Sequence, residues 1–466
     1  MLVAGVVVGV AGGALLVGHR IGLGALVVAL LVAGVAAPAL VRRRAVGDLV
    51  MLALAVGLVG VGGVRDAAWV VALSLVTAVG VGAVALTSAR SAPAVLLGGV
   101  GWFLGVLRAV GWAGRGAGHL AGRHRGRVLG LTRSVLVTVV LLTVFGLLFA
   151  SADPLFASYL PRLSAELLPG QVVAGVLVAL TSLTAAHLAV APPGWSAIGL
   201  PAARLARRGE WLLPVLALDV MVVGFVLVQV GALIGGHRYV LATTGLSYAQ
   251  YAREGFAQLA VVTALTLVVV GLAARRAPRL TAGDRLVSRT ALGVLCLGTL
   301  GVVASALRRM DLYVDAFGLT RLRVLVVLAE VAMAVVLLLV MVAGVRWRGG
   351  WLPRAVVQVV AVAMLGLAAL NPDALIVRHN TTADLDVAVD VGYLQGLSAD
   401  AVPASAEVRE PWRAQLLTCW RVEQGGGWAG WNLGRARAAE TLAAAAPGSD
   451  ASLDGSGCAA GGRRDL

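Results

Sequence analysis

The chain has 466 residues and a formal net charge of +15, and 59% of its residues are hydrophobic while only 13% are charged. Ordinary soluble domains carry roughly 25% charged residues, so this composition excludes a soluble globular protein. All 38 basic residues are arginine, and 30 of them lie among the apolar segments of residues 1–370. That distribution is typical of membrane proteins. The sequence shows no basic groove interleaved with aromatic residues, so a nucleic-acid partner is not predicted.

Apolar segments of the length that a bilayer requires of a helix recur along residues 1–370, the predicted transmembrane domain. They predict an all-α, polytopic transmembrane helical bundle of about eleven spans. The predicted partner of this bundle is the lipid bilayer. The predicted spans, in chain order, are 2–17, 22–41, 49–64, 67–86, 134–150, 171–191, 211–234, 257–274, 290–307, 324–344 and 355–370.

The arginines of the loops predict the orientation of the spans. Alternate loops, containing 42–44, 87–133, 204–208, 275–289 and 346–354, hold 21 arginines, whereas the opposite loops hold 9. Arginine accumulates on the cytoplasmic side of a membrane. The first set of loops is therefore expected in the cytoplasm of a bacterium. The N-terminus is then cytoplasmic, and the C-terminal tail lies outside the plasma membrane.

The loop 87–133 has a pattern of its own. Apolar residues recur there at helical spacing and arginines follow them: Trp102, Phe103, Val106, Leu107 and Val110, then Arg115, Arg123, Arg125 and Arg127. Such a stripe with trailing arginines is typical of a helix in the headgroup layer. Segment 102–127 is therefore predicted to contact anionic lipid. The alternatives are a solvated basic loop and a hairpin-like insertion at 92–112.

Three glycines recur every four residues in the first span, at Gly5, Gly9 and Gly13. A face of small residues at this spacing lets another helix approach closely. Chance is the competing explanation, because the chain contains 60 glycines.

The three cysteines do not indicate a metal or redox site by their spacing. Cys296 lies in an apolar span, where it suits a packed core. Cys419 and Cys458 lie in the tail and either pair, in an oxidising compartment, or stay as thiols. No cofactor or metal is predicted.

The chain becomes more polar after residue 370. Residues 371–446 predict a small extramembrane helical region, and residues 447–466, rich in Gly, Ser, Ala and Asp, predict a disordered tail. Asn432 precedes a segment with one apolar helical face, so it is predicted to be the N-cap of a helix.

Ionisable residues inside a bilayer are costly, so they are natural candidates for function. Asp219, Glu330 and His187 lie within predicted spans. If they face one interior cavity, they form a proton or ion relay, and a transporter would use Asp219 and Glu330. The structural alternative is that each side chain bonds to a neighbouring helix or pairs with an arginine.

Catalytic motifs such as HExxH, a P-loop, GxSxG or a dinucleotide fingerprint do not occur in the sequence. Acidic residues do lie in predicted outer loops: Asp153, Asp311, Asp315 and Asp373. Polytopic glycosyltransferases that act on lipid-linked sugars use acids of outer loops, but they have a sizeable first outer loop, which is short here. No catalytic residue is assigned, and a membrane enzyme is kept only as an alternative function.

The most charged stretch between two spans reads RRMDLYVDAFGLTRLR and begins at Arg308. Asp311 and Asp315 are one helical turn apart, and Arg308 is placed to pair with either. Gly318 suits the position that ends one helix, and Thr320 suits the N-cap of the next. The stretch predicts a capped turn whose charges pair at the level of the lipid headgroups.

The run MDLYVDAFGLTRLRVLVVLAE resembles the signature of a group of bacterial polytopic membrane proteins, the domains of unknown function 4173 and 4153, many from actinobacteria. Further similar stretches are FGLLFASADPLF, EWLLPVLALDVMVVGFVLVQV, TGLSYAQYAREGFAQL, NPDALIVRHN, LSADAVP and WNLGRARA. The resemblance covers residues 130–446 and implies an integral membrane protein, without an activity or ligand. It singles out Asn371, Asp373 and Asp400 as a motif of the tail.

These observations predict a plasma-membrane protein with a structural or signalling role in the cell envelope, and they leave its protein partner open. The first alternative is an ion- or proton-coupled transporter. The second is a polytopic membrane enzyme.

Overall fold

The computed structural model describes residues 2–120, 168–197, 207–244, 256–278, 280–418 and 427–445, with a few single positions between these ranges. These residues form helices and no β-strand. Ten of the described helices are long and apolar enough to cross a membrane. The predicted all-α polytopic bundle is therefore confirmed.

The chain forms two compact units. Unit 1 consists mainly of Met1–Gly199 and Arg421–Glu440, and unit 2 of Leu200–Trp420 and Thr441–Asp465. Unit 1 contains α1 (Leu2–Leu16), α2 (Leu23–Arg42), α3 (Val46–Val64), α4 (Ala68–Thr87), α5 (Ala92–Leu120), α8 (Leu168–Val190) and the 3-10 turn η2 (Gly194–Ala197). α19 (Leu433–Ala445) begins in unit 1.

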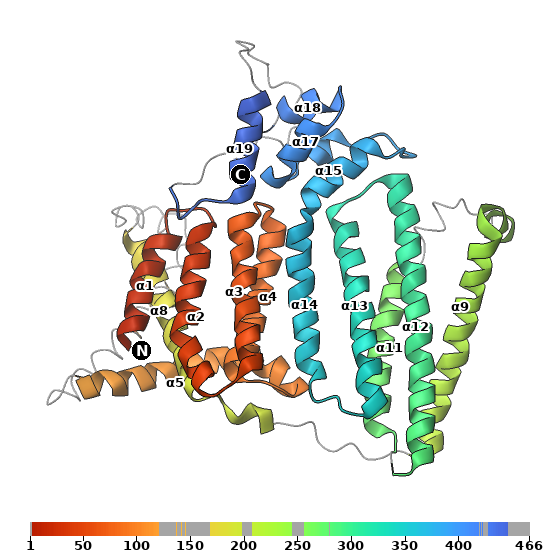
Figure 1. Cartoon of the computed structure of the whole chain (residues 1–466), viewed down its shortest axis with the longest axis horizontal. Helices are drawn as coiled ribbons and strands as arrows, with labels where there is room; N and C mark the ends of the chain where they lie inside the picture. The colour runs from red at the N-terminus through yellow and green to blue at the C-terminus, as the bar shows by residue number, and fades with distance from the viewer. Residues whose placement is uncertain are drawn as a thin grey trace. The chain divides into compact units, whose positions relative to one another are not determined.

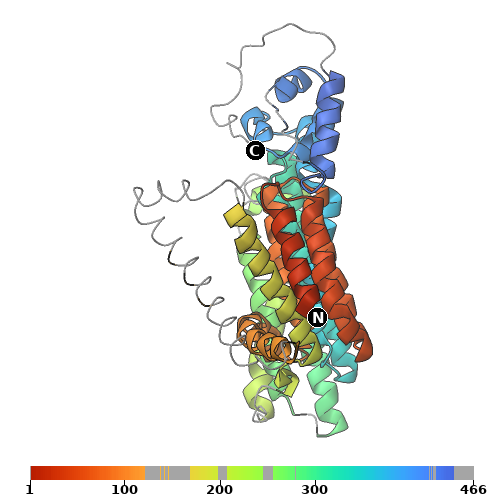
Figure 2. The ribbon, with the colours of Figure 1, turned by 90° about the vertical axis from the view of Figure 1, so that its left-hand side faces the viewer.

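In unit 1, helices α2, α3 and α4 lie side by side, and α8 packs against α1, α2 and α5. Helix α5 runs crosswise and contacts α4 and α8 near their C-terminal ends, at Val84 and Leu188. It lies horizontally in Figure 1 and is seen end-on in Figure 2. The loop 87–133 therefore begins with one continuous helix of 29 residues, and neither a hairpin nor a solvated loop forms at 92–112.

The glycines of α1 allow α8 to approach closely. A Cβ atom added to Gly9 would lie 2.6 Å from the Cβ atom of Ala179 and 2.7 Å from the carbonyl oxygen of Gly175. A Cβ atom on Gly13 would overlap the carbonyl oxygen of Gln171. The predicted small-residue face is thus used for close helix packing. Since α1 has 15 residues, its length is only about 22 Å, less than the ~30 Å of a hydrocarbon core.

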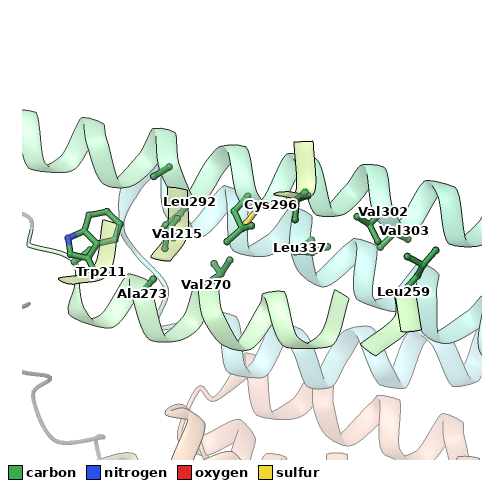
Figure 3. Close-up of a cluster of buried hydrophobic side chains, with 14 of the residues drawn as sticks. Trp211, Val215, Leu259, Val270, Ala273, Leu292, Cys296, Val302, Val303 and Leu337 are labelled. Carbon is green, nitrogen blue, oxygen red and sulfur yellow. The ribbon is translucent and has the colours of Figure 1, made fainter. Parts of the chain in front are cut away.

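Unit 2 begins with five long helices: α9 (Arg208–Thr244), α11 (Phe256–Arg276), α12 (Ala282–Phe317), α13 (Arg321–Arg346) and α14 (Leu352–Leu370). A cluster of buried hydrophobic side chains joins α9, α11, α12 and α13, as Figure 3 shows. Trp211, Val270, Leu295 and Leu337 each represent one of these four helices in the cluster. This cluster is the apolar core of unit 2.

Helices α9 and α12 run in the same direction and are packed in register. At their beginnings, Arg208 forms an ion pair with Asp284, and 21 residues further along both helices the hydroxyl of Ser305 donates to Gln229 at 3.0 Å. Between these contacts, a Cβ atom on Gly298 would lie 2.7 Å from Val222. A polar contact at the beginnings of the two helices, a second one 21 residues further along and a glycine between them fix this helix pair in register.

The chain continues from α14 into a group of short helices: α15 (Pro372–Thr382), α16 (Val391–Gln395), the 3-10 turn η3 (Ala399–Ala401), α17 (Val402–Glu407) and α18 (Trp412–Thr418). We call residues 371–418 the tail bundle. Asn371, in the left-handed region with φ +51°, is both the C-cap of α14 and the N-cap of α15. Short helices thus follow α14, and the predicted boundary at residue 370 lies next to this shared cap.

Helix α12 is longer than its predicted span of 290–307. It begins after Thr281, whose hydroxyl accepts a hydrogen bond from the amide of Asp284 while the Asp284 carboxylate accepts one from the amide of Thr281. This capping box adds more than two turns before the span. At the other end the helix continues to Phe317. Hydropathy alone located the apolar centre of the helix and missed its polar ends.

Some predictions concern residues outside the part of the chain that the structure describes. They are the span at 134–150, apart from three single helical positions, the acid Asp153, the thiols Cys419 and Cys458, the stretch 121–127 of the lipid-contact segment, and the predicted disordered tail 447–466.

Candidate functional site

A buried ion pair joins the turn between α12 and α13 to the tail bundle. Arg321, the first residue of α13, donates from Nε to Oδ1 of Asp373 at 3.0 Å and from a terminal nitrogen to Oδ2 at 2.7 Å. The Asp373 side chain is fully buried, whereas that of Arg321 keeps 33% of its exposure. This two-bond geometry is the strong form of a guanidinium–carboxylate contact.

The same carboxylate also organises the tail bundle. The amide of Ser398 donates to Oδ2 of Asp373 at 2.9 Å, and the amide of Arg321 donates to the hydroxyl of Tyr393 at 2.9 Å. Burial alone would raise the pKa of Asp373. The hydrogen bonds and charge of Arg321 and the bond from Ser398 outweigh burial, so they hold this pKa below its ordinary value. Asp373 is therefore an ionised structural anchor.

A second contact between the turn and the tail bundle comes from Asn380. Its Oδ1 accepts from the amide of Leu319 at 2.6 Å, and its Nδ2 donates to the carbonyl oxygen of Leu319 at 3.0 Å. Gly318 has a φ of +75°, and an added Cβ atom would lie 2.8 Å from Asn380 Oδ1. Glycine is required here both by the backbone conformation and by the approach of Asn380.

The turn itself is capped as the sequence predicts. Helix α12 ends at Phe317 with Gly318 as its cap, and Thr320 is the N-cap of α13, accepting from the amide of Arg323 at 3.4 Å. The guanidinium of Arg323 donates to the carbonyl oxygens of Phe317 and Gly318 and lies 4.2 Å from the centre of the Tyr313 ring. A cation thus satisfies carbonyl groups at the end of α12.

The charge pairing predicted within this turn is a minor part of what the structure shows. Arg308 pairs with Asp311 at 2.9 Å, but both side chains are more than half exposed, and such surface pairs contribute little stability. Asp315 is exposed. The stabilising pair is Arg321–Asp373, between two residues that the predicted turn did not connect.

The tail motif predicted from the resemblance is brought together. The Asn371 side chain donates to the carbonyl oxygen of Asp400 at 3.0 Å, and Asp373 lies two residues further along α15. Asp400 is 2% exposed, and the Ser398 hydroxyl donates to its carboxylate at 3.4 Å. Asn371, Asp373 and Asp400 therefore belong to one polar cluster.

The prediction missed four residues of this cluster: Arg321, Asn380, Tyr393 and Ser398. A signal was present for two of them, because Arg321 and Asn380 lie inside the quoted stretches MDLYVDAFGLTRLR and NPDALIVRHN. However, no feature of either stretch shows that the two stretches contact each other in the folded protein. The remaining two, Tyr393 and Ser398, act through a hydroxyl and a backbone amide, which carry no recognisable pattern.

A separate polar contact lies in unit 1. Asn432 is the N-cap of α19, as predicted, since it accepts from the amide of Arg435 at 3.0 Å. Its side-chain nitrogen donates to the carbonyl oxygens of Gly62 and Arg65, each at 2.8 Å. Arg435 pairs with Asp66 at 2.6 Å, and both side chains are largely buried. The start of α19 is thereby held against the end of α3.

The predicted intramembrane relay is divided between the units. His187 is in unit 1, where its ring lies 5.7 Å from that of Trp112, whereas Asp219 and Glu330 are in unit 2. Asp219 is 6% and Glu330 0% exposed. Within the described part of the chain, Asp219 Oδ1 and both carboxylate oxygens of Glu330 lack a hydrogen-bond partner. Neither unit contains all three residues.

The described residues do not form a candidate metal centre. Among them, no group of three or more His, Cys, Asp or Glu side chains is arranged to hold a metal ion. Asp311, Asp373 and Asp400 instead contact an arginine, a backbone amide or a hydroxyl group.

The apolar helices and the polar contacts at their ends define the class of this molecule, a multi-pass α-helical integral membrane protein. The chain belongs to the family described as domain of unknown function DUF4153, whose model matches residues 49–408. Of the two related families that its motifs resemble, the match is to DUF4153. Comparisons with curated proteins and with solved structures found no match.

Proposed function

We propose that this protein is a structural or signalling component of the bacterial envelope, with its arginine-rich loops in the cytoplasm and its tail bundle outside the plasma membrane. The observation that carries the proposal is the buried Arg321–Asp373 pair. A tail joined only by a flexible linker would move independently of the spans. This pair, together with Asn380, instead couples the tail bundle to two of the spans of unit 2.

The coupling has a consequence for signalling. A displacement of the end of α12 or α13 would shift the contacts of Arg321 and Asn380 and so displace the tail bundle. Because coupling between two sites is reciprocal, a ligand that binds the tail bundle would displace the ends of these helices through the same contacts. A fixed outer surface also suits a structural role. The partner of that surface is a protein or an envelope polymer.

The orientation is supported by the arginine distribution and by the positive-inside rule. Two exposed positions test it. Asp384 lies in the tail bundle, and Gly350 lies in the arginine-rich loop between α13 and α14. No atom is within 4 Å of a Cβ atom added to Gly350, so each position accepts a cysteine, in the variants Asp384→Cys and Gly350→Cys. In a background without native cysteines, a membrane-impermeant maleimide added to whole cells should label only the first. Labelling of only the second would overturn the proposed orientation.

A second candidate function, ion- or proton-coupled transport, is supported by Glu330. A fully buried carboxyl group without a described hydrogen-bond partner is rare in membrane spans and is typical of ion pathways. A catalytic role for the outer acids has less support. Asp373 is used in an ion pair, and the exposed Asp311 contacts Arg308.

Complementation of a deletion strain separates the two functions. We expect Glu330→Gln, which keeps the shape of the side chain, to restore envelope integrity fully, as measured by exclusion of an impermeant dye. An Asp373→Asn variant should restore it only in part. Failure of Glu330→Gln at normal abundance in the membrane would favour transport over the structural role.

A further inference from the structure

Helix α5 differs from the other long helices of unit 1 because it runs crosswise to them (Figures 1 and 2) and contacts α4 and α8 near their ends. One of its faces is packed on the unit. That face consists of small, buried residues at helical spacing, Ala94, Gly98, Gly101, Gly105 and Ala109. A Cβ atom on Gly105 would lie 3.1 Å from Leu188 of α8, and one on Gly101 would overlap the ring of Trp195. These contacts hold α5 in its crosswise position.

The opposite face of α5 is apolar and exposed. Leu96, Phe103 and Leu107 keep 83%, 75% and 73% of their exposure, and Val100 keeps 53%. These residues recur at intervals of three or four, so they form one stripe along the helix. Because a contiguous apolar stripe is unfavourable in water, another apolar surface or the lipid must lie against it.

The surrounding charges indicate what covers it. Arg108 and Arg115 are both exposed and are two helical turns apart, so they lie on one face that adjoins the apolar stripe. Arg90 precedes the helix and is also exposed. A helix with an apolar stripe and flanking arginines enters the interface between acyl chains and anionic headgroups.

We propose that α5 is an in-plane anchor whose apolar stripe lies among the lipid acyl chains and whose Arg108 and Arg115 bind the headgroups of anionic phospholipids. The competing arrangement is a transmembrane α5, since Ala92–Arg115 is long and apolar enough to span. The small-residue contacts with α8 and Trp195 favour the in-plane arrangement. The proposal does not depend on the role of the tail bundle.

Membrane depth measured with spin labels distinguishes the two arrangements. Leu96→Cys and Leu107→Cys are eleven residues apart, which is about 16 Å along a helix axis. In a cysteine-free background, labels at both sites should lie at the same shallow depth. Leu30→Cys and Val41→Cys of α2, exposed and also eleven residues apart, are the matched control and should differ in depth. A depth difference in α5 equal to that in α2 would overturn the proposal.

The headgroup assignment has its own test. Wild-type protein is reconstituted in vesicles of phosphatidylcholine mixed with phosphatidylglycerol, and the lipids that remain bound are counted by native mass spectrometry. Replacing Arg108 and Arg115 by Gln should reduce the preference for phosphatidylglycerol by up to roughly fivefold per arginine. The control pair, Arg346→Gln with Arg348→Gln, removes the same charge from unit 2 and should have a smaller effect. Equal effects, or none from α5, would refute the assignment of anionic lipid to this helix.

Discussion

Replacing Asp373 by Ala is expected to release the tail bundle from the α12–α13 turn and to destabilise its docking by about 3 kcal/mol. Removing one partner of a buried ion pair leaves the other charge without compensation. The effect is placed at the lower end of the usual range because Arg321 retains 33% exposure. The loss of the Ser398 contact with the same carboxylate adds to it.

The rate of cleavage by trypsin measures this release. Trypsin cleaves after basic residues, which in this chain are all arginine. Arg378 lies inside helix α15, so cleavage after it requires local unfolding. A destabilisation of about 3 kcal/mol raises the population of the open state roughly a hundredfold. We therefore expect cleavage after Arg378 in the Asp373→Ala variant to be faster by roughly that factor.

The control for this prediction is Glu407→Gln. It removes the exposed pair between Arg378 and Glu407, which should alter stability by less than about 1 kcal/mol. The double variant Arg321→Met with Asp373→Leu should be less destabilised than either single variant, because an apolar pair replaces a buried charge pair. Equal cleavage rates in wild type and Asp373→Ala would show that the pair does not hold the tail bundle.

Acidification provides an independent measure of the same contact. The pKa of Asp373 in the folded protein is below its ordinary value, which is about 3.9 in an unfolded chain. The stabilisation is therefore complete above about pH 4 and is lost as the pH falls through the folded-state pKa. Opening of the tail bundle should increase in that range in wild type. Asp373→Asn, which cannot ionise, should lose this pH dependence.

Replacing Gly9 by Leu should separate α1 from α8 and lower the free energy of unfolding of unit 1 by about 3 kcal/mol, the upper part of the range for overpacking. The neighbours of an added Cβ atom include the carbonyl oxygen of Gly175, which belongs to a helix backbone and cannot turn aside. Thermal unfolding in detergent micelles measures the effect.

Gly34→Leu is the matched control. Gly34 lies in α2, and no atom is within 4 Å of an added Cβ atom. The same change of side chain should leave the melting temperature close to that of wild type, or raise it, since glycine is a poor helix former. If both variants unfold at the same temperature, the close approach of α1 and α8 does not contribute to stability.

The helices and their capped ends follow from local sequence. Apolar runs of sufficient length predict spans, and Gly318, Thr320 and Asn432 act as helix caps because the chemistry of a cap involves only neighbouring residues. The small-residue series of α1 likewise predicts close packing, although it does not identify α8 as the partner. Family motifs point to the turn and to the tail, one motif at a time.

Only the tertiary structure decides which of these segments contact each other. Arg321 and Asp373 are 52 residues apart, Asn380 and Leu319 are 61 apart, and Arg435 and Asp66 are 369 apart. Hydropathy and helical periodicity report the surroundings of a residue averaged over a few turns. A pairwise contact across such distances depends instead on how whole helices pack.

The sequence by itself determined that this protein is a multi-pass helical membrane protein, because the bilayer sets both the length and the apolar character of each span. The tertiary structure decided that Asp373 is an anchor for the tail bundle, that α5 runs crosswise to its neighbours, and that Glu330 is buried. The physical reason is that burial and pairing of charge depend on the three-dimensional packing around a residue. A charged residue looks the same in a sequence whether it faces water, lipid or its partner.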